Sequence, residues 1–311
     1  MKRTITLLFL LTLTTIFSQN SSVTPIDLDF KQFLNCRDFT VSTDGNEAYF
    51  TVQNLIENRA VIVRTKKENG KWADFKIVSF TGTHRDIEPF LSPDNLRLYF
   101  SSNRPRANTK SNDFDIWYVE RATTKDKWSE PINLGSPVNT SFNEFYPAVS
   151  ANNNMYYTSD QFTKTRKDDI LFAKWNGKQY DAPSQLATTV NSKGYEFNAY
   201  ISPDESFLIY SIYKAKDGFG SGDLYISFKN DAGAFEQRKN LGAQINSDKM
   251  DYCPFYNTKT NTLYFTSKRI DNNYTPVSSL AEFQDFVNNY ANGLSKIYKT
   301  TIDVSALKEI K

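Results

Sequence analysis

Four carboxylate side chains recur at one position of a repeated sequence pattern. Each lies six residues before the serine or asparagine that opens a polar turn, and the four are Asp86, Glu144, Glu196 and Asp251. In the first copy of the pattern, Cys36 stands at this position. If the copies surround a common axis, the acids form a ring at one mouth of a channel. Carboxylates at close range raise one another's pKa, bind a cation such as Ca²⁺, or act as the acid and base that cleave a glycosidic bond.

The same four acids also have a structural interpretation. A residue that recurs in every repeat usually serves the repeat itself, so each carboxylate would accept hydrogen bonds from backbone N–H groups near the start of its strand. This interpretation is favoured, and under it the protein has no catalytic residues. Under the alternative, a carboxylate-dependent glycan-active enzyme, the same four acids are the catalytic candidates.

Other enzyme signatures are mostly missing. His84 is the only histidine, which excludes metal sites built from several histidines. The chain has no Gly-x-Ser-x-Gly motif, and the glycine-rich segment 218–223 leads into a strand pattern, so it predicts a turn and not a phosphate-binding loop. No cofactor is therefore expected, with Ca²⁺ at the acid ring as the alternative.

Basic side chains follow the second strand of each predicted repeat. Arg104 lies in one such loop, and Lys268 and Arg269 lie in another. These loops are expected to open at the same end as the acids, so the three side chains are the candidate ligand-binding residues, suited to an anionic glycan or a peptide terminus. Solvated surface charges are the commoner explanation of such loops, and both interpretations stay open.

The elements that would position these residues come from a fivefold repeat. Segments similar to "FLSPDNLRLYFSS" are centred on Ser42, Ser92, Ser150, Ser202 and Asn257, at intervals of 50, 58, 52 and 55 residues. Each contains an apolar strand, a polar turn and an alternating strand, and a third strand follows, with a weaker fourth strand in every copy but the last. Four strands at this period predict the blades of an all-β propeller with antiparallel sheets.

Five blades are favoured, with six as the alternative. The residues before Ser42 and after Asn257 are too few for a sixth blade. The fifth copy lacks its fourth strand, and segment 25–30, "PIDLDF", is expected to supply it and so close the ring. Segment 278–293 interrupts the last blade and predicts a helix with a Ser279–Glu282 capping box, which is expected to pack over the end of the propeller.

The two cysteines, Cys36 and Cys253, both fall near the start of an inner strand, in the first and the last blade. These blades are neighbours in a closed five-bladed ring, so the pair is a disulfide candidate in an oxidising compartment. The two positions are offset by two residues in register, and a disulfide tolerates only a narrow range of Cα separations. A bridge and two buried thiols therefore both remain open.

The N-terminus predicts export. Residues 1–18 combine Lys2 and Arg3 with an apolar run and a small residue at the end, which is typical of a signal peptide. The protein would then be periplasmic or secreted, with residues 19–311 as a single propeller domain, no membrane span and a monomeric state. Removal of the signal leaves 35 basic and 35 acidic residues (37 − 2 = 35), and this balance argues against nucleic acid as a partner.

Several motifs resemble the TolB-like, WD-repeat-like propeller repeats of bacterial exported proteins. These are "SPDN" at 92–95, "SPDE" at 202–205 and "SSNRP" at 101–105, together with three strands that begin Asp-Ile or Asp-Leu. The resemblance covers essentially the whole chain after residue 18 and implies the propeller fold, with envelope proteins or glycans as partners. The chain departs from TolB in blade count and lacks its separate N-terminal domain, so the partners of TolB are not carried over.

The expected function is that of an exported, non-enzymatic binding or scaffolding module. Its ligand or partner would bind at the loop face around the central channel. The alternative is the carboxylate-dependent glycan-active enzyme, which needs two carboxylates that converge in an open pocket. A chaperone-like partner of an envelope complex is a third hypothesis.

Overall fold

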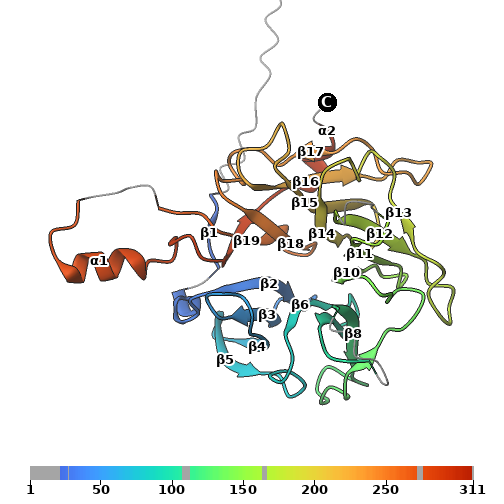
Figure 1. Cartoon of the computed structure of the whole chain (residues 1–311), viewed down its shortest axis with the longest axis horizontal. Helices are drawn as coiled ribbons and strands as arrows, with labels where there is room; N and C mark the ends of the chain where they lie inside the picture. The colour runs from blue at the N-terminus through green and yellow to red at the C-terminus, as the bar shows by residue number, and fades with distance from the viewer. Residues whose placement is uncertain (1–21, 27, 107–112, 163–166, 272–275, 310–311) are drawn as a thin grey trace, which may run out of the picture.

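Short, regularly spaced strands build five similar sheets around one axis (Figure 1). The computed structural model describes residues 22–26, 28–106, 113–162, 167–271 and 276–309. Within these ranges each sheet has four antiparallel strands, so the predicted five-bladed all-β propeller is confirmed and the six-bladed alternative is wrong.

In each blade the strands are hydrogen-bonded in order from the axis outward. Blade one contains β2 (Cys36–Val41), β3 (Glu47–Gln53), β4 (Ala60–Glu68) and β5 (Lys71–Ile77). Blade two contains β6 (Asp86–Leu91), β7 (Arg97–Ser102), β8 (Asp115–Glu120) and β9 (Ile132–Asn133). Blade three contains β10 (Glu144–Val149), β11 (Met155–Ser159), β12 (Asp169–Ala173) and β13 (Ser184–Gln185). Blade four contains β14 (Glu196–Ile201), β15 (Phe207–Tyr213), β16 (Gly222–Phe228) and β17 (Lys239–Asn240). Blade five contains β18 (Asp251–Asn257), β19 (Thr262–Ser267), β20 (Lys296–Thr301) and β1 (Thr24–Pro25).

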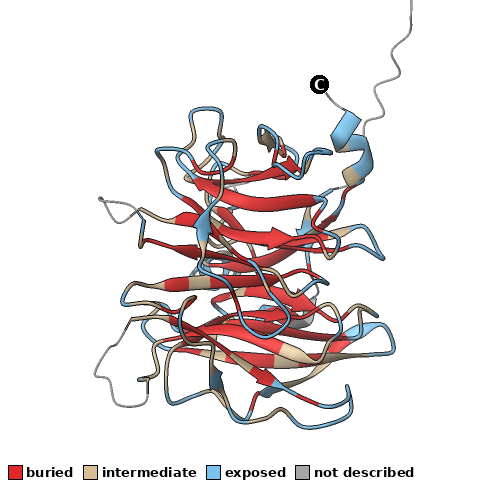
Figure 2. Cartoon of the chain, turned by 90° about the vertical axis from the view of Figure 1, so that its right-hand side faces the viewer, coloured by how far each residue is buried: buried red, intermediate tan, exposed pale blue. Residues whose placement is uncertain are grey.

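The inner strands carry the core of the molecule (Figure 2). Every residue of β6 and β18 is buried, because an innermost strand packs against neighbouring blades on both faces. The outermost strand has only two residues in every blade except the first, and both residues of β13 are exposed. Burial therefore decreases from the axis to the rim, and the side chains with the least freedom are those at the axis.

The N-terminus supplies the fourth strand of blade five, as predicted. Thr24 pairs with Lys299 of β20, and the strand ends one residue later. The expected strand over 25–30 is shorter because the chain enters a 3₁₀ helix, η1 (Leu28–Gln32). Phe30 in this helix is fully buried beside Phe50 and Phe75 of blade one, with ring centroids 4.8 and 5.3 Å away. The segment therefore ties blade five to blade one.

The predicted helix in the last blade is α1 (Leu280–Val287). Its Ser279–Glu282 capping box is present, with the Glu282 N–H donating to the Ser279 hydroxyl at 3.2 Å. No residue of α1 is buried, and the helix projects away from the blades (Figure 1), so the expectation that it packs over the propeller end is wrong. Another helix, α2 (Val304–Glu309), follows β20 and is not indicated by the repeat pattern.

The predicted signal peptide, residues 1–18, lies outside the described residues and stays a prediction. In the part of the chain that the structure covers, no helix is long and apolar enough to cross a membrane.

A bulge at the same place in every inner strand positions one special side chain per blade. The strand register shifts after the second residue of β2, β6, β10, β14 and β18. The third residue of each strand has a positive φ, between 49° and 63°, and these residues are Asp38, Glu88, Tyr146, Asn198 and Cys253. Such a backbone costs about 1–3 kcal/mol at a residue other than glycine. The repeated blade structure thus holds all five residues in left-handed backbone, which Asp38 and Asn198 adopt more readily than the other three.

Candidate functional site

The four predicted carboxylates are fully buried at the first residue of their inner strands. In three blades a hydroxyl residue four positions earlier donates both its backbone N–H and its hydroxyl group: Thr140 to Glu144, Ser192 to Glu196 and Ser247 to Asp251. Asp86 accepts instead from the hydroxyl of Thr81, at 2.7 Å. Each acid therefore links the loop between two blades to the next inner strand through hydrogen bonds. None of the four acids lines either of the two pockets described below.

Two of the three basic candidates repeat the same contacts in different blades. Arg104 pairs with Asp86 at 2.7 Å, and Arg269 pairs with Asp251 at 2.9 Å. Each arginine also donates to a serine hydroxyl at the end of its own second strand and to a backbone carbonyl near the acid. The third candidate, Lys268, pairs with Glu57 at 3.0 Å and is one-third exposed. All three lie at the end of the propeller where the inner strands begin.

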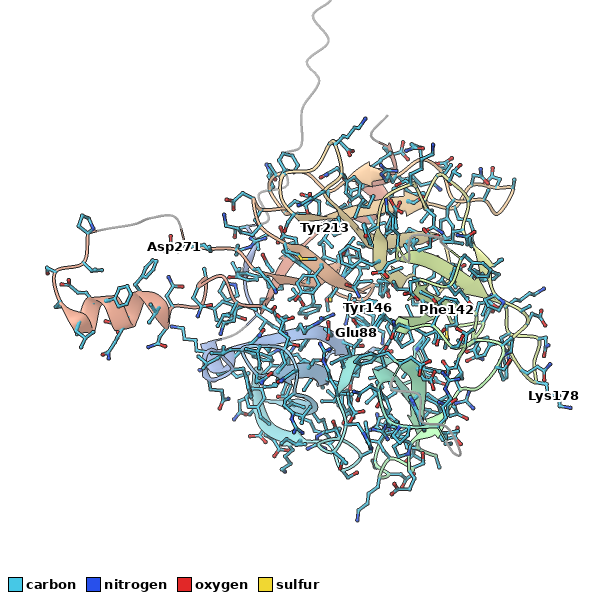
Figure 3. All side chains as sticks on the ribbon, viewed as in Figure 1. Glu88, Phe142, Tyr146, Lys178, Tyr213 and Asp271 are labelled. Carbon is cyan, nitrogen blue, oxygen red and sulfur yellow. The ribbon has the colours of Figure 1, made fainter. Side chains whose placement is uncertain are left out.

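The five bulge residues meet around the propeller axis and are called the axial ring here: Asp38, Glu88, Tyr146, Asn198 and Cys253. Figure 3 places Glu88 and Tyr146 near the centre of the propeller. The side-chain nitrogen of Asn198 lies 3.5 Å from a Glu88 oxygen, and the side-chain oxygen of Asn198 lies 3.5 Å from the Cys253 thiol. Blades two and four are not neighbours, so the first of these contacts crosses the axis.

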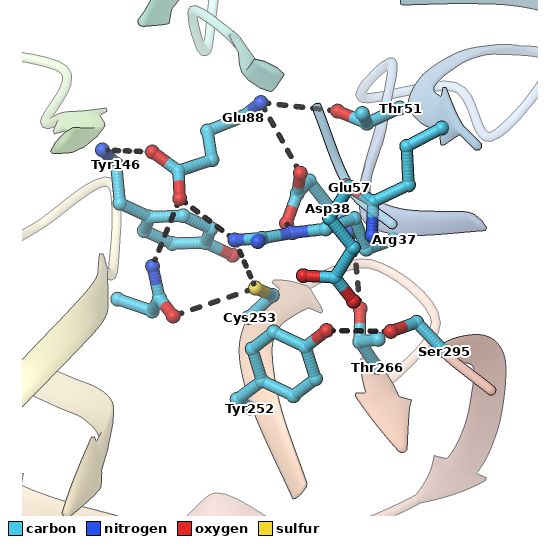
Figure 4. A network of polar contacts seen from close by, with 12 residues as sticks. Arg37, Asp38, Thr51, Glu57, Glu88, Tyr146, Tyr252, Cys253, Thr266 and Ser295 are labelled. Atoms are coloured by element: carbon cyan, nitrogen blue, oxygen red, sulfur yellow. Dashed lines mark hydrogen bonds and ion pairs between the residues drawn. The ribbon is translucent and has the colours of Figure 1, made fainter. Parts of the chain in front are cut away.

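One cation serves two acids in this ring. Arg37 pairs with Asp38 at 2.6 Å and with Glu88 at 2.7 Å, and all three side chains are nearly inaccessible (Figure 4). The backbone N–H of Glu88 donates to Asp38, and that of Tyr146 donates to Glu88. Burial raises the pKa of Glu88 to about 7, Arg37 opposes the rise, and the charge of Asp38 adds to it. Glu88 is thus a carboxyl group that holds a proton close to neutral pH.

A pocket of about 250 Å³ opens onto this ring at the end where the inner strands begin, and it is called the polar mouth here. Its lining comes from all five inner strands and adjoining segments: Arg37, Arg85, Ile87, Glu88, Phe145, Thr158, Asp168, Phe197, Asn198, Met250 and Tyr252. Burial raises the pKa of Asp168 to about 6, and the charges of Asp160 and Asp169 act in the same direction. The polar mouth therefore holds two carboxyl groups, both with pKa values above the ordinary range.

The opposite end of the channel is apolar. A second pocket, of about 280 Å³, is lined there by the ends of the inner strands and the polar turns. Phe90, Tyr200 and Phe255 come from blades two, four and five, and their ring centroids lie 5.3–6.4 Å apart. Because these rings contact one another across the axis, they fill the channel beyond the axial ring. The polar mouth is therefore a closed-ended pocket.

Counting back four residues from each turn serine or asparagine would have identified the axial ring in the sequence. That position holds Asp38, Glu88, Tyr146, Asn198 and Cys253, five residue types of different chemistry. The position counted six residues back holds acids in four of five copies, which suits a shared structural role. A position that varies within an otherwise regular repeat is the better signal for a site, because it does not serve every blade alike.

The two cysteines are buried and free, so the disulfide candidate Cys36–Cys253 is not formed. The two-residue offset explains this. Cys36 is the first residue of β2 and its N–H donates to the carbonyl of Ser295, whereas Cys253 belongs to the axial ring and contacts Arg37. Burial raises the pKa of the Cys36 thiol to about 12. Elsewhere in the described chain, no group of three or more histidine, cysteine or acidic side chains is arranged to hold a metal ion.

Comparisons with known proteins find solved structures of similar fold. No family model and no curated protein sequence matches the chain. The GH43 endo-arabinanase from Bacillus licheniformis is similar in structure over 87% of this chain and 96% of its own, with 13% identity and a TM-score of 0.52. The α-L-arabinofuranosidase PaAbf62A from Podospora anserina, in complex with cellotriose, is similar over 90% and 95%, with 9% identity and a TM-score of 0.54. TolB from Acinetobacter baumannii is matched over 86% of this chain and 54% of its own, with 9% identity and a TM-score of 0.42.

These findings correct the functional expectation. Five solved structures that are similar to this chain over nearly all of both chains, with TM-scores above 0.5, are glycoside hydrolases. These neighbours contradict the expectation of a non-enzymatic binding or scaffolding module, and they agree better with its alternative. The similarity is one of fold, so any catalytic role has to be inferred from the residues of the polar mouth.

Proposed function

We propose that this protein is a glycan-active enzyme that hydrolyses a glycosidic bond in the polar mouth, with Glu88 as proton donor and Asp168 as base. One observation carries the proposal: two carboxyl groups with separate, raised pKa values line the same pocket. Glycoside hydrolysis needs such a pair, one protonated and one ionised at the working pH. The pKa of Glu88, about 7, lies above that of Asp168, about 6, so Glu88 is the group that keeps its proton to higher pH.

Glu88 has the surroundings of a general acid. One of its oxygens accepts from Arg37 and the other from the N–H of Tyr146, so the carboxyl group is held in one orientation. Asp38 shares the same guanidinium and leaves it with less positive charge to stabilise ionised Glu88. The proton of Glu88 is thereby available for the leaving oxygen of the sugar. Asp38 is fully buried and acts through Arg37 and Glu88 as a positioning residue.

Asp168 has the surroundings of a base. It precedes β12, and in the described part of the chain its side chain forms no hydrogen bond or ion pair that would occupy its oxygens. An ionised carboxylate with a raised pKa accepts a proton from water more readily than an ordinary one. Phe145, Phe197 and Tyr252 add aromatic surface to the same pocket, which suits the apolar C–H faces of a sugar ring.

Hydrolysis of glycans by the purified protein tests the proposal. The names of the similar structures place arabinan, aryl arabinofuranosides, and xylo- and cello-oligosaccharides first in the substrate panel, followed by other polysaccharides and aryl glycosides. Glu88→Gln and Asp168→Asn should each lower kcat/KM by about 100-fold or more for the substrate that is found. The matched control is Glu196→Gln, a buried acid outside the pocket, which should keep kcat/KM within about twofold. A panel without any released sugar would refute the proposal, as would unchanged activity in both variants.

Two sequence predictions extend the proposal. Residues 1–18 direct export to the periplasm or the exterior, as the pattern of Lys2, Arg3 and the following apolar run supports. The blades belong to the TolB-like kind of repeat, as the turns at 92–95 and 202–205 support. Mass spectrometry of the protein recovered from the periplasm or medium tests the first point, with a mature chain that begins after residue 18 as the expected result.

A further inference from the structure

The polar mouth contains a cation without a carboxylate partner. Arg85 lines the pocket beside Glu88, and its guanidinium lies over the ring of Phe114 at 5.4 Å. The Nε atom of Arg85 is buried and has no hydrogen-bond partner among the described residues. None of the ion pairs in the described part of the chain includes this side chain. The hydrogen bonds of Arg85 among the described residues involve its backbone: its N–H donates to the side chain of Asn103, and its carbonyl accepts from the N–H of Asn103.

Three other arginines at this end of the propeller each have a carboxylate partner. Arg37, in the same pocket, is held by Asp38 and Glu88 together. Arg104 and Arg269, which do not line the pocket, are each paired with one buried acid. Each of these three arginines therefore has a buried acid, whereas Arg85 has none within ion-pair distance among the described residues.

An unpartnered guanidinium in a partly buried pocket is unfavourable for the free protein. Its buried Nε donor loses water without gaining an acceptor, and burial and the nearby charge of Arg37 lower its pKa. Glu57, Glu88 and Asp38 attract it at longer range, and none of them lies within ion-pair distance in the described structure. An anionic group on a bound ligand would satisfy it. Arginine presents a planar fork of N–H donors that matches a carboxylate in two parallel hydrogen bonds.

We propose that Arg85 binds a carboxylate on the sugar, so that the substrate of the polar mouth is an acidic glycan with a uronic-acid residue next to the bond that is cleaved. This inference rests on the proposed function for the site and names its substrate class. The acidic sugar places its carboxylate against Arg85, and its glycosidic oxygen faces Glu88. A neutral sugar of the same shape leaves Arg85 unsatisfied and binds less tightly.

Binding measurements with matched sugars test this. The probes are oligogalacturonates and glucuronic-acid-substituted xylo-oligosaccharides, each compared with its carboxyl-reduced neutral twin. Isothermal titration calorimetry on Glu88→Gln, which slows turnover, should show that at least one acidic probe binds roughly 10- to 100-fold more tightly than its twin. Adding Arg85→Met should bring that ratio to about one, and Arg85→Lys should restore part of it. The control is Arg97→Met, which removes an arginine on the exposed Glu120 pair and should keep the ratio.

The outcomes separate this inference from the proposed function. Equal binding of every acidic probe and its neutral twin overturns the inference, and so does a preference that survives Arg85→Met. Hydrolysis of neutral glycans at the polar mouth, without any preference for uronic acids, overturns the inference and keeps the proposed function. Binding of an acidic probe that depends on Arg85, without hydrolysis of any glycan, keeps the inference and overturns the proposed function.

Discussion

Replacing Glu144 with glutamine should make the protein more stable at alkaline pH. In blades two and five, an arginine two residues after the end of the second strand pairs with the buried acid. In blade three that position holds Gln161, whose backbone N–H makes the equivalent bond to Ser159 while its side-chain nitrogen is buried without a partner. Glu144 forms no ion pair among the described residues. Burial therefore raises its pKa to about 8, against the hydrogen bonds from Thr140.

The sign and size of the effect follow from this pKa. The folded protein holds the proton of Glu144 up to about pH 8, whereas the unfolded chain releases it near the ordinary value of 4.5. This contribution to stability is fully present below about pH 4.5 and is lost as the pH rises to about 8. Because a pKa difference of one corresponds to about 1.4 kcal/mol, ionising Glu144 in the folded protein costs about 4–5 kcal/mol. Glutamine is never ionised and avoids the cost.

Urea unfolding between pH 5 and pH 9 measures this. The free energy of unfolding of Glu144→Gln, relative to that of the natural protein, should increase by several kcal/mol across this range. Gln161→Arg, which restores the pair of blades two and five, should also gain stability at pH 8–9. The contrasting control is Asp251→Asn, which leaves Arg269 without its acid and should cost about 3 kcal/mol at pH 7. Parallel pH dependences for Glu144→Gln and the natural protein would refute the reasoning.

Three further expectations test other parts of the structure. With the substrate found in the panel above, kcat/KM should rise through about pH 6 as Asp168 ionises and fall above about pH 7 as Glu88 loses its proton. A flat profile of kcat/KM from pH 5 to 8 would contradict these roles. Phe30→Ala should lower the free energy of unfolding by about 3–5 kcal/mol in urea, since the ring is fully buried at the seam, and a loss under 1 kcal/mol would show that the seam is held elsewhere. Titration of the unfolded, unreduced protein should find two thiols per chain, and none would mean that Cys36 and Cys253 are bridged after all.

The architecture could be predicted because it is encoded locally and five times over. Each repeat carries its own strand patterns and turn residues, so the count of blades follows from the copies around Ser42 to Asn257. The helix at 280–287 is also local, since its capping box is visible in four consecutive residues. The packing of that helix was wrongly predicted, because its apolar side chains look the same in sequence whether they face the blades or solvent. Phe283 is nearly half exposed.

The polar mouth could not be predicted in the same way. Its floor depends on a bulge whose positive φ is imposed by the blade and is adopted by residue types as different as Glu88 and Tyr146. Its walls include Arg85 and Asp168, which lie at the edges of loops that belong to one blade each. The sequence pattern instead drew attention to the acids that recur, and these are the ones that fasten each blade to the next. Residues that recur in every repeat have a structural role that all the blades share. A site at the axis instead uses a different side chain from each blade.

The axial ring departs from what stability alone would select. Two residues further along the inner strands, Phe90, Tyr200 and Phe255 fill the axis with aromatic rings. A similar apolar layer at the axial ring would avoid the desolvation of Arg37 and two acids, because a buried ion pair is often no more stable than apolar residues of the same volume. The chain instead keeps at this level a guanidinium shared by two carboxylates, with a third acid and an unpartnered arginine above it. A polar cluster that the fold does not need, placed at the closed end of a pocket, is best explained by what it binds and does there.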